Sequence, residues 1–365
     1  MKKTLIALAA VAATTTAMAD VTIYGRLDVG MNNTKVTVAP VGADTLWIKN
    51  NNAVSEDGLS TGLLGFKGTE DLGGGMSANF VHEMDLDMDV GALGVAAGRN
   101  STVGLKGGFG ELRLGRSYTP LFSTIGMSDV FGTTGAGTVN TLGMAATAVR
   151  ASNAIFYTTP AMGGFTASVM VQNNNAQTSL SVGNAGKSSA NGFSLNYASG
   201  PLAVAFANGT EKGSSVDRVA GIFADVFNAA NAAAAAAATA NTKYTGNALS
   251  ATYDLGVAKA YFGYVSTKDD NDTTVANGEI KMKETNVGVA VPMGSLTLMG
   301  GVGRNKASVT GEAGSATGTD VVLGATYALS KRTTTYIKTG TYGKYKNETG
   351  SVKTTRTSVG LRHTF

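Results

Sequence analysis

The chain has 365 residues, no cysteine and a formal net charge of +4, and 15% of its residues are charged. The absence of cysteine excludes disulfide scaffolds, thiolate metal sites and cysteine nucleophiles. The small net charge argues against a nucleic-acid binder, which usually carries a concentrated basic excess. Glycine is abundant, with 49 residues, but proline is scarce, with 5, so neither a disordered nor a collagen-like chain is expected.

The first predicted element is a targeting segment at residues 1–19. Lys2 and Lys3 precede an apolar stretch, and residues 17–19 read Ala-Met-Ala before Asp20. This order of features is typical of a secretory signal peptide. We therefore expect cleavage before Asp20, with residues 20–365 forming the exported domain. No later apolar run is long enough for a membrane-spanning helix, which excludes a bundle of such helices.

The exported chain alternates apolar and polar residues in one segment after another. Residues 21–29, VTIYGRLDV, place Val, Ile and Leu side chains on one face and Tyr, Arg and Asp side chains on the other. Successive strand side chains point to opposite faces, so each such segment is predicted to be a strand. Sixteen strands are predicted, near residues 21–31, 61–70, 76–87, 101–107, 111–117, 153–159, 165–173, 191–198, 202–209, 246–254, 258–267, 282–291, 296–304, 319–328, 333–343 and 355–365.

The connections between these strands alternate in length. Those after odd-numbered strands are long, such as 118–152 and 210–245, whereas those after even-numbered strands are short turns such as 71–75. Strands of about ten residues with every long loop at one end are typical of outer-membrane barrels, which have short periplasmic turns and long extracellular loops. We therefore predict an all-β fold, a 16-stranded antiparallel transmembrane β-barrel. A barrel of this size encloses an aqueous channel rather than a packed core.

The long segment 210–245 is rich in alanine, and residues 232–238 are alanine without interruption. This is a low-complexity stretch. Alanine has the highest helix propensity, so a short helix and an irregular extracellular excursion both stay open for it. No chemistry is assigned to it.

Several blocks of the sequence resemble the Gram-negative general porins of the neisserial and burkholderial type. These blocks are VTIYGRLD at 21–28, LGFKGTEDLGGGM at 64–76, VGLKGGFGELRLGR at 103–116, LSKRT at 329–333 and SVGLRHTF at 358–365. Two positions depart from the family pattern. Phe156 stands where the family often carries arginine, and Asp129 is the only acid between Ser117 and Arg150.

The resemblance implies a homotrimer of sixteen-stranded barrels in the outer membrane of a Gram-negative bacterium. It implies that the third long loop, residues 118–152, folds inward as a constriction of each lumen. The expected partners are outer-membrane lipid and lipopolysaccharide. The resemblance also implies that Phe365 is a signal read by the outer-membrane assembly machinery.

Motifs for catalysis and metal binding are scarce. Residues 58–62, GLSTG, match G-x-S-x-G, but the motif requires a following helix and a histidine partner. The only histidines are His82 and His363. Residues 85–91 lack the sixth-position glycine and distal glutamate of a calcium loop. We expect no enzyme, no cofactor and no metal site, although divalent-cation binding by Asp85 to Asp89 stays open.

Charged side chains on the predicted polar face are the candidate functional residues, because that face points into the lumen. Fixed charges bias the passage of ions wherever a lumen narrows. Basic residues outnumber the two acids, Glu83 and Asp129, that are expected to face them across a constriction. The candidate pore-lining residues are Arg26, Lys67, Glu83, Lys106, Arg113, Arg116, Asp129, Arg150 and Arg362.

The predicted function is passive diffusion of small hydrophilic solutes and ions through this channel, with a weak preference for anions. The main alternative is a substrate-selective outer-membrane channel, which would carry an aromatic track along its lumen. A surface adhesin is less favoured, because a solenoid would show a repeat of about 20–50 residues and the chain alternates loop lengths instead.

Overall fold

The computed structural model describes residues 20–40, 47–55, 58–94, 98–132, 148–176, 187–213, 242–270, 279–309, 315–347 and 350–365. The expected signal peptide 1–19 and the alanine-rich stretch 232–238 lie outside these residues. The described helix is α2 (Pro120–Met127). The strands are β1 (Asp20–Pro40), β2 (Trp47–Ser55), β3 (Leu63–Gly73), β4 (Met76–Asp87), β5 (Ala92–Gly94), β6 (Ser101–Gly107), β7 (Gly110–Tyr118), β8 (Arg150–Thr158), β9 (Phe165–Ala176), β10 (Lys187–Ser199), β11 (Leu202–Gly213), β12 (Thr242–Asp254), β13 (Lys259–Asp270), β14 (Glu279–Met293), β15 (Leu296–Val309), β16 (Ala316–Ala328), β17 (Thr333–Asn347) and β18 (Gly350–Thr364).

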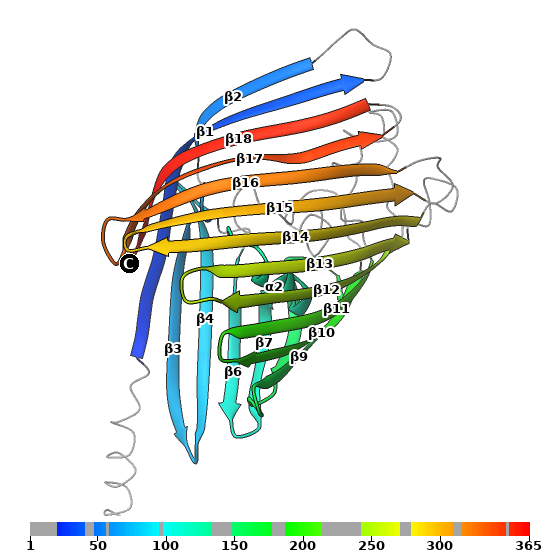
Figure 1. Cartoon of the computed structure of the whole chain (residues 1–365). Helices are drawn as coiled ribbons and strands as arrows, with labels where there is room; N and C mark the ends of the chain where they lie inside the picture. Colours follow the sequence, from blue (N-terminus) through cyan, green and yellow to red (C-terminus); the bar gives the residue numbers. More distant parts are fainter. Residues whose placement is uncertain are drawn as a thin grey trace, which may run out of the picture.

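These strands form one closed antiparallel barrel (Figure 1). Most strands pair with their neighbours in the sequence, and β1 pairs with β18 to close the sheet. β2 and β3 share one position in the wall, because they pair with different parts of β1. β5 and β6 share another, because both pair with β4. The predicted barrel of sixteen strand positions is therefore confirmed.

The break between β2 and β3 is held by Asp28, a fully buried carboxylate on β1. Its Oδ2 atom accepts hydrogen bonds from the backbone N–H and the hydroxyl of Ser60, at 2.7 and 3.0 Å. Its Oδ1 atom accepts one from the Tyr336 hydroxyl at 2.6 Å. A buried carboxylate needs such partners, and here they fix residues 58–60 against β1.

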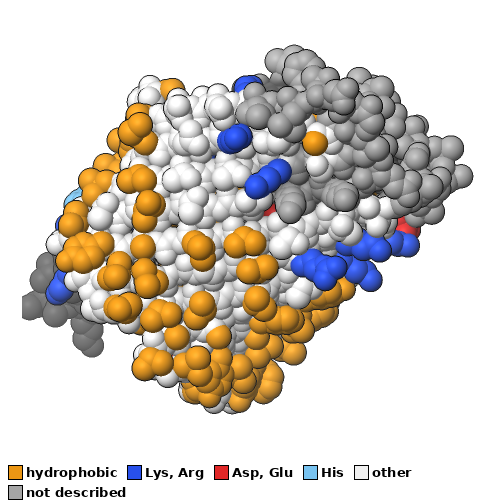
Figure 2. Space-filling view, turned by 45° about the horizontal axis from the view of Figure 1, so that its top comes forward, with side chains coloured by type: hydrophobic (Ala, Val, Ile, Leu, Met, Phe, Trp, Pro, Cys, Tyr) orange, Lys and Arg blue, Asp and Glu red, His pale blue; other side chains and the backbone are white. Residues whose placement is uncertain are grey.

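The outer face of the barrel is apolar. Ile23, Val103 and Leu323 expose 60%, 65% and 59% of their residue surface, whereas the residues next to each of them in its strand face inward. Figure 2 shows hydrophobic side chains gathered over the left and lower parts of this surface. This arrangement suits a lipid environment, since lipid offers no hydrogen-bond partner and a closed barrel leaves no strand edge unpaired. The described part of the chain holds no helix long and apolar enough to cross a membrane.

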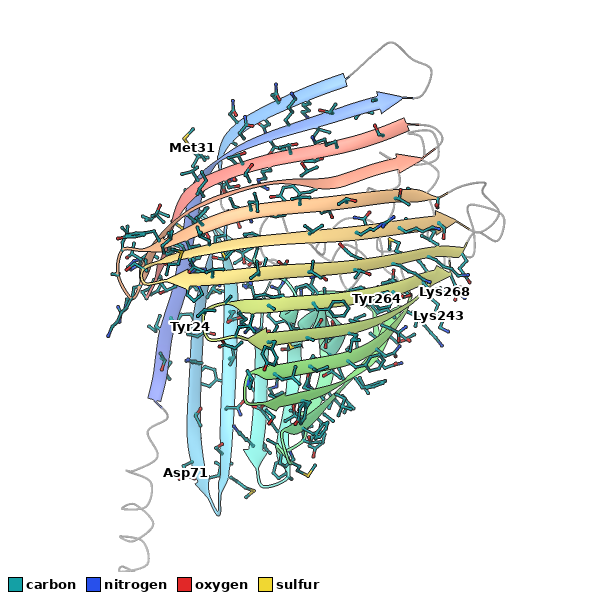
Figure 3. The ribbon with its side chains drawn as sticks, viewed as in Figure 1. Tyr24, Met31, Asp71, Lys243, Tyr264 and Lys268 are labelled. Carbon is teal, nitrogen blue, oxygen red and sulfur yellow. The ribbon has the colours of Figure 1, made fainter. Side chains whose placement is uncertain are left out.

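The two ends of the barrel differ as the sequence predicts. Short turns join β3 to β4 and β10 to β11 at one end. Asp71 marks that end in Figure 3, whereas Lys243 and Lys268 mark the opposite end, where the long connections lie. Most strands extend beyond their predicted bounds at the long-loop end: β1 continues to Pro40, and β14 begins at Glu279.

Candidate functional site

Residues 119–132 leave the barrel wall after β7 and run along the inside of the barrel. Thr119 caps α2, since its hydroxyl oxygen accepts a hydrogen bond from the backbone N–H of Phe122 at 3.1 Å, and Pro120 occupies the first turn. Both features favour a helix start. The Thr119 hydroxyl also donates to the carbonyl oxygen of Ala148 at 2.8 Å, which joins the start of this long connection to its end.

Two polar side chains of the opposite wall anchor this segment. The Ser250 hydroxyl of β12 donates to the carbonyl oxygen of Thr124 at 2.6 Å. The Asn286 amide of β14 donates to the carbonyl oxygen of Ser128 at 2.8 Å. Both side chains lie on the face opposite the exposed apolar residues of their strands, so the segment is inside the barrel (Figure 1).

Two glycines of the wall make room for the segment. A Cβ atom at Gly246 would lie 2.6 Å from Cδ2 of Leu121, and one at Gly263 would collide with the Ser128 side chain. Real Cβ contacts do not reach such distances, so any larger residue would push α2 or the residues after it away from the wall. These glycines therefore set how closely the segment approaches β12 and β13.

Facing this segment, Arg99, which precedes β6, and Arg150 of β8 meet at Tyr118. The guanidinium groups of Arg99 and Arg150 donate to the Tyr118 hydroxyl at 3.0 and 3.1 Å. The Arg150 guanidinium also lies over the Tyr118 ring, 4.7 Å from its centroid. A single phenol oxygen thus links two cations that would otherwise repel each other.

Arg99 connects this pair to β1. Its guanidinium donates to Asp85 Oδ1 at 2.7 Å and to the Thr61 hydroxyl at 2.6 Å, and the side chain is almost fully buried. Arg26 donates from Nε to the Thr61 carbonyl oxygen at 2.9 Å. Nearby, Arg116 donates to the carbonyl oxygen of Gly98 at 2.6 Å and to the Ser152 hydroxyl at 2.5 Å.

We call Arg26, Arg99, Arg116 and Arg150 the arginine cluster. The charges of Arg99 and Arg362 act on Arg26, and the charge of Arg150 acts on Arg116. Asp85, which is paired to Arg99, is the one acid with an ion pair to a cluster member within the described residues. The four guanidinium groups of the cluster therefore share one ion-paired carboxylate, while Asp28 and Glu83 act on Arg26 and Arg99 from nearby.

The two candidate acids lie in different places. Glu83 of β4 accepts hydrogen bonds from the Tyr24 hydroxyl at 2.8 Å and from the Asn100 amide at 2.5 Å, so it belongs to the same wall as the arginine cluster. Asp129 follows α2 and is buried, and its Oδ1 atom accepts a hydrogen bond from the Phe131 backbone N–H at 2.8 Å. It lies beside β13 and β14, across the barrel. Glu83 and Asp129 therefore lie on different sides of the barrel.

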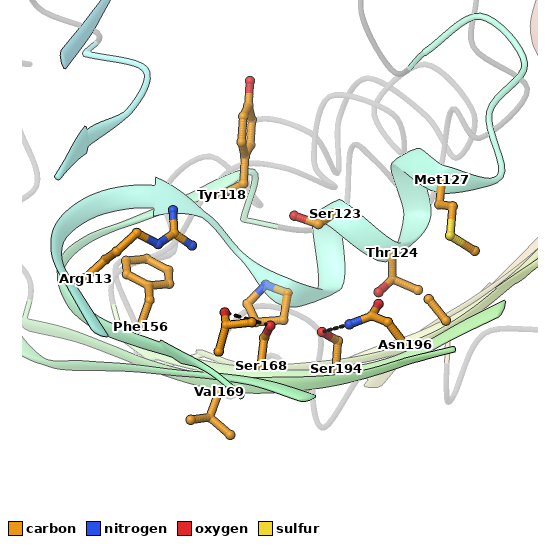
Figure 4. Close-up of a pocket in the computed structure, with 13 residues that line it drawn as sticks. Arg113, Tyr118, Ser123, Thr124, Met127, Phe156, Ser168, Val169, Ser194 and Asn196 are labelled. Atoms are coloured by element: carbon orange, nitrogen blue, oxygen red, sulfur yellow. Dashed lines mark hydrogen bonds between the residues drawn. The ribbon is translucent and has the colours of Figure 1, made fainter. Parts of the chain in front are cut away.

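Arg113 reaches into a cavity of about 160 Å³ between α2 and the wall of β8 to β11 (Figure 4). Its guanidinium lies 5.6 Å from the centroid of the Phe156 ring. The opposite side carries Ser168, Ser194 and Asn196, and the Asn196 amide donates to Ser194 at 3.2 Å. The cavity is smaller than the roughly 300–1,000 Å³ of drug-sized ligand sites, and one guanidinium and several hydroxyl groups line it.

The remaining candidate cations lie on strands away from Tyr118. Lys67 Nζ is 5.0 Å from the centroid of the Tyr24 ring. Lys106 of β6 is in register with Glu111 of β7 near the turn end, and Arg362 of β18 is in register with Asp28 of β1. Neighbouring residues on antiparallel strands share a face, and this places Arg362 on the face of buried Asp28.

The terminal residue Phe365 completes the barrel seam. Its backbone N–H donates to the Gly25 carbonyl oxygen at 3.1 Å, and its own carbonyl accepts from the Gly25 N–H at 3.0 Å. Its ring lies over Gly25, where a Cβ atom would collide with it. β1 and the last residue are therefore tied by both backbone and side chain.

Ser60 and the two histidines have hydrogen-bond partners within the barrel wall. Ser60 donates its hydroxyl to Asp28. His82 contacts the Ser101 hydroxyl at 3.1 Å, and His363 contacts the Thr333 hydroxyl at 2.9 Å. Among the residues that the structure describes, no three His, Asp or Glu side chains are grouped so that they could hold a metal ion.

The sequence reasoning missed Arg99 and Tyr118. Arg99 precedes β6 in an irregular stretch, where alternation assigns no face, and Tyr118 is the last residue of β7. The α2 helix was also missed inside the long connection 118–152. The pair Thr119-Pro120 was the available signal, because threonine before proline is a common helix start.

Comparisons with known proteins agree with this architecture. A family model described as "Gram-negative porin" matches residues 4–350. Outer membrane porin protein 32 of Delftia acidovorans is 31% identical over the full length of both chains. The major outer membrane protein P.IB of Neisseria meningitidis is 28% identical over the full length of both. The solved anion-selective porin from Comamonas acidovorans is 27% identical, with a TM-score of 0.73 over 95% of this chain and 100% of that chain.

A family match over nearly the whole chain, a relative 31% identical along its full length and a closed barrel with an apolar outer face lead to one conclusion. The chain belongs to the Gram-negative porin family, as a diffusion channel of the outer membrane.

Proposed function

We propose that this channel passes small hydrophilic solutes and ions with a weak preference for anions, and that the arginine cluster sets this preference. The observation that carries the proposal is the convergence of Arg99 and Arg150 on Tyr118, with Arg26 and Arg116 beside them. Guanidinium groups stay charged at any working pH. In a narrow lumen with low-dielectric walls, such fixed charges concentrate anions and repel cations.

We propose residues 118–152 as the constriction loop. The support is α2, which lies inside the barrel, and the anchoring of Thr124 and Ser128 on β12 and β14. In this proposal the lumen narrows between the arginine cluster on one side and Asp129 on the other. The pore-lining set then comprises Arg26, Lys67, Glu83, Lys106, Arg113, Arg116, Asp129, Arg150 and Arg362.

We also propose a homotrimer embedded in outer-membrane lipid and lipopolysaccharide, delivered there by the outer-membrane assembly machinery with Phe365 as the signal. The sequence resemblance and the porin family match support the trimer. The contact between Phe365 and Gly25 supports a role for the last residue in barrel closure. The anion-selective porin at 27% identity supports the proposed ion preference.

Processing of residues 1–19 forms a separate prediction. The sequence from Lys2 to Ala19 has the charged, apolar and Ala-x-Ala regions of a signal peptide. The outer-membrane form is expected to begin Asp20-Val-Thr-Ile. N-terminal sequencing of protein extracted from outer membranes measures this directly, and a mature protein that still carries Met1 would contradict it.

A planar-bilayer recording in a salt gradient tests the proposed function. We expect conductance steps in groups of three, from a trimer, and a reversal potential on the anion side. The anion preference should weaken as salt rises from 0.1 to 1 M, because the Debye length falls from about 10 to about 3 Å. A cation-side reversal potential at low salt would overturn the proposed selectivity, and the absence of conductance would overturn the channel itself.

The cavity beside Arg113 favours a second candidate function, a channel that retains selected solutes. Its guanidinium and hydroxyl groups could hold a small hydroxylated anion on its way through the lumen. Such a channel would show solute flux that saturates with concentration, whereas simple diffusion stays proportional to it. Flux measurements with liposomes distinguish the two.

A further inference from the structure

The hydroxyl group of Tyr118 has one hydrogen bond still to make. A phenol oxygen accepts two hydrogen bonds and donates one. Arg99 and Arg150 occupy both acceptor positions, at 3.0 and 3.1 Å. Among the residues that the structure describes, none accepts the proton that Tyr118 itself can donate. The hydroxyl group is therefore a donor without an acceptor, placed between two cations.

The position of Tyr118 leaves this donor open to the lumen. The residue is half-buried, and Figure 4 shows its ring standing away from the wall of β8 to β11, with the hydroxyl group at the far end. The ring stacks on Phe122 of α2, with 5.3 Å between the centroids and 12° between the planes. Because α2 lies inside the barrel, this stack holds the hydroxyl group on the lumen side.

Arg150 has unused donors beside the same point. It lies directly opposite Tyr118 in the pairing of β7 with β8. A guanidinium group carries five N–H groups, but within the described part of the chain that of Arg150 donates only to Tyr118. No described acid forms an ion pair with it. An acceptor that approaches the Tyr118 hydroxyl group therefore also meets N–H groups of Arg150.

The two arginines make the hydroxyl group a stronger donor. Hydrogen bonds polarise one another, so a hydroxyl group that accepts from two cations donates more strongly than a free one. The field of a cation depends on charge and distance, and it attracts small anions of equal charge to a similar degree. A hydroxyl donor instead distinguishes anions by how well their oxygen atoms accept a hydrogen bond. Tyr118 thus adds a chemical preference to a cluster that otherwise recognises mainly charge.

We propose that Tyr118 is a specificity-determining residue, which donates its hydroxyl proton to a passing anion while Arg150 donates to the same anion. The ligand class is small oxyanions with strongly accepting oxygen atoms, above all carboxylates. The inference rests on the proposed function for the location of the arginine cluster in the narrow part of the lumen. It concerns the preference among anions, whereas the proposed function concerns anions against cations.

Formate and nitrate are the probes, because both are small planar ions of the same charge and formate accepts hydrogen bonds more strongly. A bilayer with potassium formate on one side and potassium nitrate on the other gives their permeability ratio from the reversal potential. A hydrogen bond made in the narrow part of the lumen lowers the barrier for the anion that accepts it. Tyr118→Phe should therefore lower the permeability of formate relative to nitrate by about two- to tenfold, which corresponds to one net hydrogen bond.

Tyr118→Phe leaves the arginines supported. Arg99 keeps its bonds to Asp85 and Thr61, and Arg150 keeps an aromatic ring beneath its guanidinium. The ratio of chloride to potassium permeability should therefore change far less than the ratio of formate to nitrate. If both ratios fall by the same factor, the hydroxyl group acts only by holding the arginines, and the proposal is wrong. An unchanged ratio of formate to nitrate would also overturn it.

Tyr24→Phe is the matched control. The Tyr24 hydroxyl group belongs to the same wall, but it already donates its proton to Glu83 Oε1 at 2.8 Å. We expect this variant to keep the wild-type ratio of formate to nitrate permeability. A fall as large as that in Tyr118→Phe would mean that any lost hydroxyl group has the effect, and it would refute the assignment to Tyr118.

Arg150→Lys tests the second donor, and it also serves if Tyr118→Phe does not assemble. The variant keeps the positive charge, but an ammonium group cannot offer the paired N–H groups that a carboxylate accepts from a guanidinium. We expect the ratio of formate to nitrate permeability to fall, and an unchanged ratio would contradict the proposal. A wild-type reversal potential on the cation side in a potassium chloride gradient would instead refute the proposed function, so the two failures are distinguishable.

Discussion

Replacing Arg26 and Arg150 together by glutamine is expected to shift the reversal potential of the channel toward cations at 0.1 M salt. Two unit charges 4 Å apart interact by about 1 kcal/mol in water and about 4 kcal/mol at an effective dielectric constant of about 20. An ion in a narrowed lumen lies between these limits, and about 1.4 kcal/mol already changes its local occupancy tenfold. We therefore expect the permeability ratio of anions to cations to fall by about three- to tenfold.

The control for this experiment removes the same number of positive charges from the outer face of the barrel. Lys283→Gln/Lys306→Gln lowers the net charge equally, but both side chains point away from the lumen. Its reversal potential should match that of the wild type. The shift in the arginine variant should shrink in 1 M salt, because screening shortens the range of the field. An arginine variant that assembles normally and keeps its low-salt reversal potential would show that these side chains do not line the narrow part of the pore.

Replacing Gly263 by valine is expected to lift the segment after α2 off the barrel wall. The new Cβ atom would collide with the Ser128 side chain and with the Asn286 amide, which now donates to the Ser128 carbonyl oxygen. Overpacking of this kind costs about 1–3 kcal/mol. The displaced residues move into the lumen, so single-channel conductance should fall and fluctuate more. Recordings of single trimers measure both effects.

Gly300→Val serves as the matched glycine control. Gly300 lies on β15 in register with Val289 on the outward face, and its nearest neighbour is the flexible side chain of Leu323 at 3.2 Å. Its conductance should equal that of the wild type. If Gly263→Val also conducts like the wild type, residues 118–152 do not form the constriction, even though residues 119–132 lie inside the barrel.

The barrel could be predicted from the sequence because lipid and water impose opposite demands on successive residues. Each strand needs an apolar side chain at every second position to face lipid, and that period is visible without any structure. Alternation did not predict the strand segments that have water on both faces of the sheet. β2 and the outer half of β1 are rich in Asn, Thr and Lys and carry few apolar residues, so the sequence predicts a loop over residues 32–60.

The candidate site was less predictable than the barrel. The alternation of apolar and polar residues placed Arg26 and Arg113 on the lumen face of their strands. It could not place Arg99, which lies outside a regular strand. The register of the pairing between β7 and β8 shifts between Gly115 and Ser117. This shift interrupts the alternation at Arg116, so the sequence alone could not assign the face of Arg116. The meeting of Arg99 and Arg150 at Tyr118 depends on three segments that only the folded chain brings together.

The pairing of β1 with β18 joins the strands that are furthest apart in the sequence. Every other pairing joins strands that are next or next but one in the sequence, but this seam needs the first and the last strand of the chain. The entropy lost in closing a loop grows only with the logarithm of its length, so the long separation adds little to the free energy of the finished barrel. Its effect is kinetic. Until the seam forms, two long strand edges are open to pairing with other chains. Lipid offers such edges no hydrogen-bond partner, so the seam has to close as the barrel enters the membrane.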